Sequence, residues 1–292
     1  MLYNMNDFRR GAALAAALIL TSMSSAGAAT SFEKAKESGT VEVGIANEKP
    51  YGYLETDGSV NGVIIDVLRA VLKPIGIDKI KGNVSEFSAL IPAINARRFD
   101  VLGAGMAITP KRCEAIAFSN PFTRIANVLA AKTGNPNKIH SLEDIAASKS
   151  LKVGSQVGAS QVADLHRVGI PEDRIVLFAR DTEAIAGLKA GRVDAIYYPA
   201  LEVSELIKKF GESEVERVQP FTIAKDDKGK PLYVFQAFGF NKADSDFVAA
   251  VNDGIKNLSA SGKLLEILAP YGFTKDDLPD ASVTAEGLCS GS

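Results

Sequence analysis

Arg112 is a side chain whose type could bind an acidic group of a small molecule. It follows Thr109, Pro110 and Lys111, and proline commonly occupies the first position of a helix. A guanidinium can bind a carboxylate through two parallel hydrogen bonds, which are stronger than hydrogen bonds between neutral groups. The plainer alternative is a surface arginine at a helix start.

Three further side chains could bind a positively charged group. Tyr51 and Phe87 offer aromatic faces, which attract delocalised or alkylated cations. Glu48 could pair with the cationic half of a zwitterion. Phe87 directly precedes Ser88, the expected N-cap of a helix over 89–97, so its ring could project from a loop. Ordinary core packing of the rings, and a solvated loop position for Glu48, are the alternatives.

A second place for an anion lies at Gly158, Ala159 and Ser160, which open an expected helix over 159–168. The backbone N–H groups at a helix N-terminus can hold an anion, and the Ser160 hydroxyl could add a hydrogen bond.

Signatures of enzymes and of nucleic-acid-binding proteins are missing from the sequence. No phosphate loop, dinucleotide fingerprint or serine-nucleophile elbow occurs. His140 and His166 are the only histidines, and neither has a second histidine or a cysteine four residues on. The net charge is only −2, and basic and acidic residues are mixed along the chain. We therefore expect no cofactor, no metal and no nucleic-acid partner.

The first 29 residues have the pattern of a secretory signal peptide. Arg9 and Arg10 precede a short apolar run over 11–23, and residues 26–28 offer an Ala-x-Ala cleavage site. A membrane anchor is the alternative, but a spanning helix needs about 20 apolar residues. We expect residues 1–29 to be removed and the mature protein to lie in the periplasm.

Only two cysteines, Cys113 and Cys289, occur in the chain. Export places them in an oxidising compartment, which favours a disulfide between them. Two unpaired thiols, or a dimer formed through the tail, are the alternatives.

Strands alternating with helices predict an α/β fold with parallel sheets. Residues 94–102 and 188–196 resemble each other, since each stretch ends a helix, passes an arginine and an aspartate, and opens a buried strand. We read them as parts of two similar lobes. Ligands of such sheets bind at the carboxyl ends of the strands, so a cleft between the lobes is expected.

Several stretches resemble the solute-binding proteins of polar amino-acid ABC importers, family 3. In the first half these are 89–97, 99–101 and 105–112, with its Thr-Pro-x-Arg element, and the Phe-Ser-x-Pro element of 118–122. Residues 153–158 and 190–195 look like second-lobe signatures of the same family. The resemblance extends over residues 40–272.

The resemblance implies a two-lobed periplasmic binding protein type II fold with a hinge of two crossing strands, near 125–131 and 234–238. Lobe 1 would contain residues 30–128 and 236–292, and lobe 2 residues 129–235. Both cysteines would then share lobe 1. The resemblance also implies a monomeric, non-enzymatic protein that delivers its solute to the membrane permease of an ABC transporter.

The family's site carries over to positions of this chain. Arg112 would bind the ligand carboxylate, and Gly105 and Ala107 would add backbone contacts. Glu48, the aromatic residues 51 and 87, Cys113 directly after Arg112 and the C-terminal Cys289 resemble the ectoine- and hydroxyectoine-binding proteins more narrowly. Ala107 departs from that pattern, because those proteins carry an aromatic residue there and other relatives often carry Ser or Thr.

Another departure lies at Tyr197, Tyr198 and Pro199, where amino-acid binders of the family usually carry an aspartate for the ligand ammonium. A buried ammonium without a carboxylate would cost several kcal/mol. We therefore expect a ligand other than a standard α-amino acid held in the usual way, with Tyr198 in the site. A dispersed or methylated cation, as in ectoine-like or betaine-like solutes, fits better.

Two other functions stay open. A periplasmic cyclohexadienyl or arogenate dehydratase uses the same fold, so the fold does not exclude an enzyme. Glu48 is the obvious acid or base for such a reaction. A ligand-sensing binding protein is the other alternative.

Overall fold

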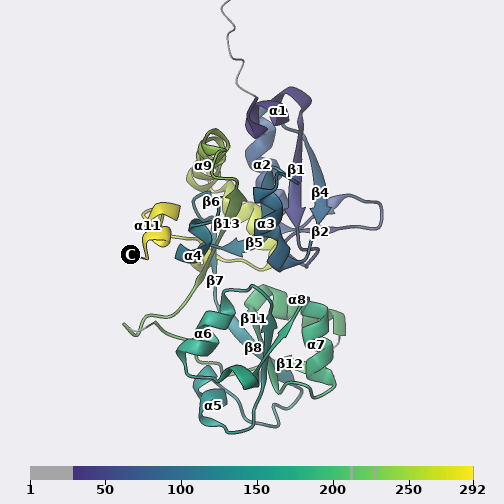
Figure 1. Cartoon of the computed structure of the whole chain (residues 1–292), viewed down its shortest axis with the longest axis vertical. Coiled ribbons are helices and arrows are strands. Elements are labelled where there is room, and N and C mark those ends of the chain that lie inside the picture. The colour runs from purple at the N-terminus through teal and green to yellow at the C-terminus, as the bar shows by residue number, and fades with distance from the viewer. Residues whose placement is uncertain (1–28, 211–212, 227, 292) are drawn as a thin grey trace, which may run out of the picture.

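Two separate sheets, each flanked by helices, divide the structure into two lobes (Figure 1). The computed structural model describes residues 29–210, 213–226 and 228–291. The predicted signal peptide lies almost entirely outside these residues. Among the helices of the described ranges, none is long and apolar enough to cross a bilayer.

The first sheet has the strand order β4-β1-β5-β13-β6, and β7 also pairs with β13. β1 runs parallel to β4 and β5, whereas β13 is antiparallel to its neighbours. The strands are β1 (Thr40–Ile45), β4 (Lys79–Val84), β5 (Val101–Ala107), β6 (Ala117–Phe118), β7 (Thr123–Ile125) and β13 (Val234–Phe240). A small separate hairpin consists of β2 (Tyr53–Leu54) and β3 (Val60–Asn61).

The helices of the first lobe come from both ends of the described chain. They are α1 (Ser31–Ser38), α2 (Val63–Leu72), α3 (Leu90–Asn95), α4 (Pro110–Cys113), α9 (Ser245–Ala260), α10 (Lys263–Leu268) and α11 (Ala285–Ser290). Short 3-10 turns are η1 (Lys73–Ile75), η2 (Phe87–Ala89), η4 (Ala269–Tyr271) and η5 (Lys275–Asp277).

The second sheet has the order β10-β9-β11-β8-β12. Its strands are β8 (Asn127–Lys132), β9 (Val153–Gln156), β10 (Ile175–Phe178), β11 (Ala195–Pro199) and β12 (Val215–Arg217). Its helices are α5 (Leu142–Ala147), α6 (Gln161–Arg167), α7 (Asp181–Lys189) and α8 (Ala200–Phe210), with the 3-10 turn η3 (Glu172–Arg174).

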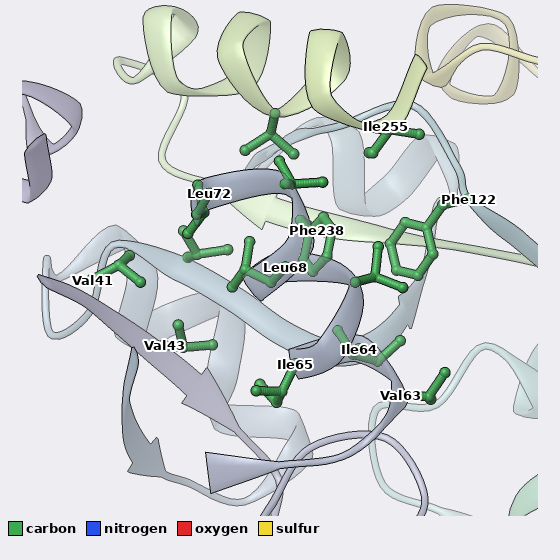
Figure 2. Close-up of a cluster of buried hydrophobic side chains, with 14 of the residues drawn as sticks. Val41, Val43, Val63, Ile64, Ile65, Leu68, Leu72, Phe122, Phe238 and Ile255 are labelled. Atoms are coloured by element: carbon green, nitrogen blue, oxygen red, sulfur yellow. The ribbon is translucent and has the colours of Figure 1, made fainter. Parts of the chain in front are cut away.

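Each lobe has its own hydrophobic core. In the first lobe, α2 is apolar on most of its surface because it packs between the sheet and α9, and Ile64, Ile65 and Leu68 are fully buried there (Figure 2). In the second lobe, side chains of β8 alternate between two clusters. Leu129 belongs to one cluster and Val128 to the other. This is the period of two expected for a strand that is buried on both faces.

The chain crosses between the lobes at two places, which form the hinge. β7 pairs with β13 in the first sheet, and β8, which begins one residue after Ala126, pairs with β11 in the second sheet. The chain returns to the first sheet through β13. The two crossings agree with the predicted hinge, whereas the residue boundaries at 128–129 and 235–236 stay predictions.

The segment before the Thr-Pro element folds differently from the prediction at one point. Ser88 does not cap a helix. It lies inside the 3-10 turn η2, and α3 begins at Leu90 with Ala89 at its N-cap and without a side-chain cap.

The disulfide between Cys113 and Cys289 is present, with the two Cα atoms 5.7 Å apart. It joins α4 to α11, which lie side by side in the first lobe (Figure 1). The predicted pairing is confirmed, and the bridge does not cross the hinge.

Candidate functional site

A cavity between the lobes collects most of the predicted site residues. It spans about 400 Å³ of space between protein atoms, part of it open to solvent. The first lobe lines it with Glu48, Tyr51, Phe87, Ala104, Gly105, Ala107, Arg112 and Val234. The second lobe lines it with Gln156, Ala159, Ser160, Gln161, Tyr198, Pro199 and Glu202. Every predicted ligand-binding residue is in this lining except Gly158, which contacts Arg112 from the second lobe.

Arg112 is placed by the short helix α4. Pro110 opens that helix as predicted, and the Thr109 hydroxyl accepts a hydrogen bond from the Arg112 backbone N–H at 3.3 Å. Arg112 as a whole residue is only 9% exposed. It donates one hydrogen bond to the carbonyl of Ala107 at 2.8 Å and another to the carbonyl of Gly158 at 2.9 Å.

The charge of Arg112 has only neutral hydrogen-bond partners among the described residues. Burial lowers the pKa of its guanidinium to about 10, so the group is charged at neutral pH. A buried charge without an opposite charge is unfavourable. An anionic group in the cavity would compensate it, and this arrangement suits a carboxylate.

Gly158 lies where the two lobes touch. Its backbone has a φ of +79°, and a Cβ atom there would lie 3.1 Å from Cβ of Ser88 in the first lobe. Both the conformation and the close approach favour glycine. The carbonyl of Gly158, and not its N–H group, contacts Arg112, and α6 begins only at Gln161.

The lobes are in a closed arrangement, because polar contacts besides that of Arg112 with Gly158 join them. Gln156 Nε2 donates a hydrogen bond to Glu48 Oε1 at 2.5 Å. At the outer edge, Arg180 Nη2 lies 2.6 Å from Glu86 Oε1.

Two buried carboxyl groups line the same cavity from opposite lobes. Glu48 is 7% exposed, and burial, with a smaller contribution from Asp181, raises the pKa of its carboxyl to about 8. Glu202 is 4% exposed, and burial, followed by the nearby Glu48, raises the pKa of its carboxyl well above the ordinary value. Neither group has a cationic side chain within ion-pair distance among the described residues.

The aromatic residues surround this charged centre. Tyr51 is 3% exposed and belongs to the core of the first lobe as well as to the cavity wall, so the two roles predicted as alternatives are combined. The ring centroid of Phe87 lies 5.6 Å from Cζ of Arg112. Gly105 leaves room for Tyr51, because a Cβ atom at that glycine would lie 2.8 Å from the ring.

Sequence reasoning missed six lining residues: Ala104, Gln156, Gln161, Pro199, Glu202 and Val234. Gln156 ends strand β9, so the rule that ligands meet strand carboxyl ends could have found it. Glu202 lies one turn beyond the position where an aspartate was sought, and it supplies a second-lobe carboxylate. The second lobe therefore places a carboxyl group in the cavity lining, although the aspartate usual in amino-acid binders is absent near position 199.

Residues 41–275 match the sequence profile of the bacterial extracellular solute-binding proteins, family 3. The chain belongs to this family. Over 286 residues, this binding protein is 34% identical to a probable amino-acid ABC transporter periplasmic-binding protein of Sinorhizobium fredii, covering 96% of this chain and 93% of the relative. It is 25% identical to the L-cystine-binding protein of Escherichia coli K12, covering 79% and 82% of the two chains.

Solved structures agree with this assignment. The binding protein superimposes on EhuB in complex with hydroxyectoine with a TM-score of 0.79 and 31% identity, covering 89% of this chain and 98% of EhuB. An ancestral arginine-binding protein bound to glutamine matches with a TM-score of 0.68 and 28% identity, covering 80% and 98%. The predicted family and the two-lobed fold are confirmed.

Proposed function

We propose that this protein is the extracytoplasmic binding component of an ABC importer and that it binds a small zwitterionic carboxylate solute between its lobes. The single observation that carries the proposal is Arg112, a buried residue that lines the inter-lobe cavity and whose side chain, among the described residues, bonds only to carbonyl groups. The protein would act as a periplasmic monomer after removal of its signal peptide and would deliver the solute to a membrane permease.

In the proposed complex, the ligand carboxylate binds Arg112 and the ligand cation faces Glu48. Tyr51, Phe87 and Tyr198 then enclose the apolar part of the solute. Relatives of this chain bind hydroxyectoine, cystine and arginine by their names. Each of these molecules carries a carboxylate and a nitrogen cation, which supports this ligand class.

Ligand binding would drive lobe closure by a population shift. Only a ligand that makes more contacts in the closed form favours closure, and shifting a ratio from 1:99 to 99:1 takes about 5.5 kcal/mol of differential binding. The ligand carboxylate on Arg112 would lie next to Gly158 of the opposite lobe. The ligand cation on Glu48 would lie next to Gln156, which also belongs to the opposite lobe. Both ends of the solute therefore favour the contact between the lobes.

The test is a thermal-shift and calorimetric screen of hydroxyectoine, ectoine, betaines and amino acids on the mature protein. We expect at least one such solute to stabilise it, by about 2.7 kcal/mol at a hundred times its Kd. Arg112→Ala should weaken binding at least a hundredfold, because the carboxylate loses a charge-assisted pair. Lys111→Ala, the exposed neighbour, should not. Equal affinity of the two variants would contradict the proposal.

Glu48 is the residue that supports the second candidate function, a dehydratase. A buried carboxyl with a raised pKa is suited to general acid catalysis. Incubation with prephenate, followed by absorbance, tests it. We expect no turnover; a signal that disappears in Glu48→Gln would favour the dehydratase.

A further inference from the structure

We infer that Glu202 is a second cation-recognising carboxylate of the cavity and that it limits the ligand to solutes whose cation carries at least two N–H donors. Amidinium, guanidinium and primary ammonium groups meet this condition, whereas quaternary ammonium groups do not. The inference rests on the proposed function, because it concerns the same cavity.

The first observation is the position of Glu202. It lies in the first turn of α8, directly after β11, and lines the cavity together with Tyr198 and Pro199. Its neighbours along the helix, Val203 and Leu206, pack in the core of the second lobe. A carboxylate is out of place on such a face unless it has a polar partner.

The second observation is that the part of the chain described by the structure supplies no such partner. Oε1 of Glu202 is buried and accepts no hydrogen bond from any described residue. The hydroxyl of Tyr198, on the preceding strand, is also buried and has no hydrogen-bond partner within the described ranges. A buried acceptor without a donor costs about 1–3 kcal/mol, and more when it is charged. A ligand donor in the cavity would remove this cost.

The third observation is the pairing with Glu48. The two carboxyls come from different lobes, and the negative charge of Glu48 raises the pKa of Glu202. A cation held by both must donate in two directions. A trimethylated nitrogen has no N–H group and would leave the oxygen of Glu202 unpaired.

The protons released when a ligand binds can be measured, and they report on whether the two carboxyls recognise its cation. Burial raises the pKa of both carboxyls before a ligand binds, and Asp181 acts in the same direction on each. Glu86 also raises the pKa of Glu48, whereas Arg180 lowers it. A bound cation favours the ionised forms, so binding should release protons.

The experiment compares the wild type, Glu202→Gln and Glu205→Gln by calorimetry with arginine, hydroxyectoine and glycine betaine. Glu205, one turn further along α8, lies outside the cavity lining and is the matched control. We expect binding of at least one N–H cation and none of betaine. Glu202→Gln should weaken that binding ten- to hundredfold. In buffers of different ionisation enthalpy it should also release fewer protons than Glu205→Gln.

The outcomes separate the inference from the proposed function. If no carboxylate solute binds the wild type, or if Arg112→Ala binds as well as the wild type, the proposed function fails. If an Arg112-dependent ligand binds Glu202→Gln with unchanged affinity and unchanged proton release, only the role of Glu202 fails. Betaine binding to the wild type as tight as that of an N–H cation overturns the inference without any variant.

Discussion

At the scale of single residues, burial acts in opposite directions on the two groups that we assign to the ligand charges. The guanidinium of Arg112 keeps its charge, because its lowered pKa of about 10 is still well above neutrality. The carboxyl of Glu48 loses its charge, because its raised pKa of about 8 is above neutrality. In the ligand-free cavity, Arg112 is therefore already charged for binding an anion, whereas Glu48 must lose a proton before it can bind a cation as a carboxylate.

This difference predicts that affinity rises with pH between about 6 and 8 and levels off above 8. The ionised form of Glu48 binds the cation better, so a lower pH adds the cost of removing its proton. Asp181 and Glu86 raise the pKa of Glu48 further, whereas the hydrogen bond from Gln156 and the charge of Arg180 lower it. The measurement is Kd against pH, with Glu48→Gln as the variant that should give a flatter profile. A wild-type profile that is flat from pH 6 to 8 would refute the assignment.

The same raised pKa has the opposite sign for folding. The ligand-free folded state binds a proton at Glu48 more tightly than the unfolded chain, whose carboxyl has the ordinary pKa of 4.5. This contribution to stability is complete below about pH 4.5 and is lost as the pH rises through 8. We therefore expect the melting temperature of the ligand-free wild type to fall, relative to that of Glu48→Gln, as the pH rises from about 4.5 through 8. Glu48→Gln lacks this titrating group, so its melting temperature should not show this contribution.

At the scale of elements, the site depends on α4, a helix too short to be stable by itself. Three features hold it: the Thr109 cap, Pro110 at its first position and the disulfide from Cys113 to Cys289 on α11. Asn120 adds a bond to the tail, since its Oδ1 accepts from the backbone N–H of Ala285. The C-terminal tail thus anchors the segment that carries Arg112.

We predict that the double variant Cys113→Ser/Cys289→Ser lowers both stability and ligand affinity. A disulfide closing a long loop typically contributes about 2–4 kcal/mol to stability, and here it also restrains the residue next to Arg112. Thermal unfolding measures the first effect and calorimetry the second. Unchanged affinity in a destabilised variant would mean that Thr109 and Pro110 position the guanidinium without help from the tail.

At the scale of the whole molecule, the contacts between the lobes differ in how strongly they stabilise the closed arrangement. Arg180 and Glu86 are 63% and 40% exposed in their side chains, so solvent screens this pair and it adds little to closure. The contact between Glu48 and Gln156 is buried, and that between Arg112 and Gly158 is partly buried. Closure therefore depends on groups that also face the ligand, which couples binding to domain movement.

A substitution at Gly158 should separate the lobes. Its added Cβ would press on Ser88 across the cleft, whereas at Gly134, with a similar φ of +82°, a Cβ would meet nothing within 4 Å. We expect Gly158→Ala and Gly134→Ala to lose similar stability from backbone strain, but only Gly158→Ala to bind ligand less tightly. Small-angle scattering of the ligand-saturated proteins should show a larger radius of gyration for Gly158→Ala alone. Equal radii and equal affinities would show that Ser88 can move away from the added Cβ atom without separating the lobes or weakening binding.

The sequence by itself determined the features that depend on neighbouring residues or on a simple pairing. Pro110 after Thr109 specifies the turn that presents Arg112, the continuous apolar run of β8 is typical of a strand buried on both faces, and two cysteines allow one bridge. Only the tertiary structure decided that Gly158 turns its carbonyl to Arg112, that Gln156 reaches Glu48 and that Glu202 faces the cavity. These contacts join residues from 46 to 108 positions apart, or depend on which face of α8 is covered. They are set by how two lobes pack on each other, and no local pattern of residues encodes that placement.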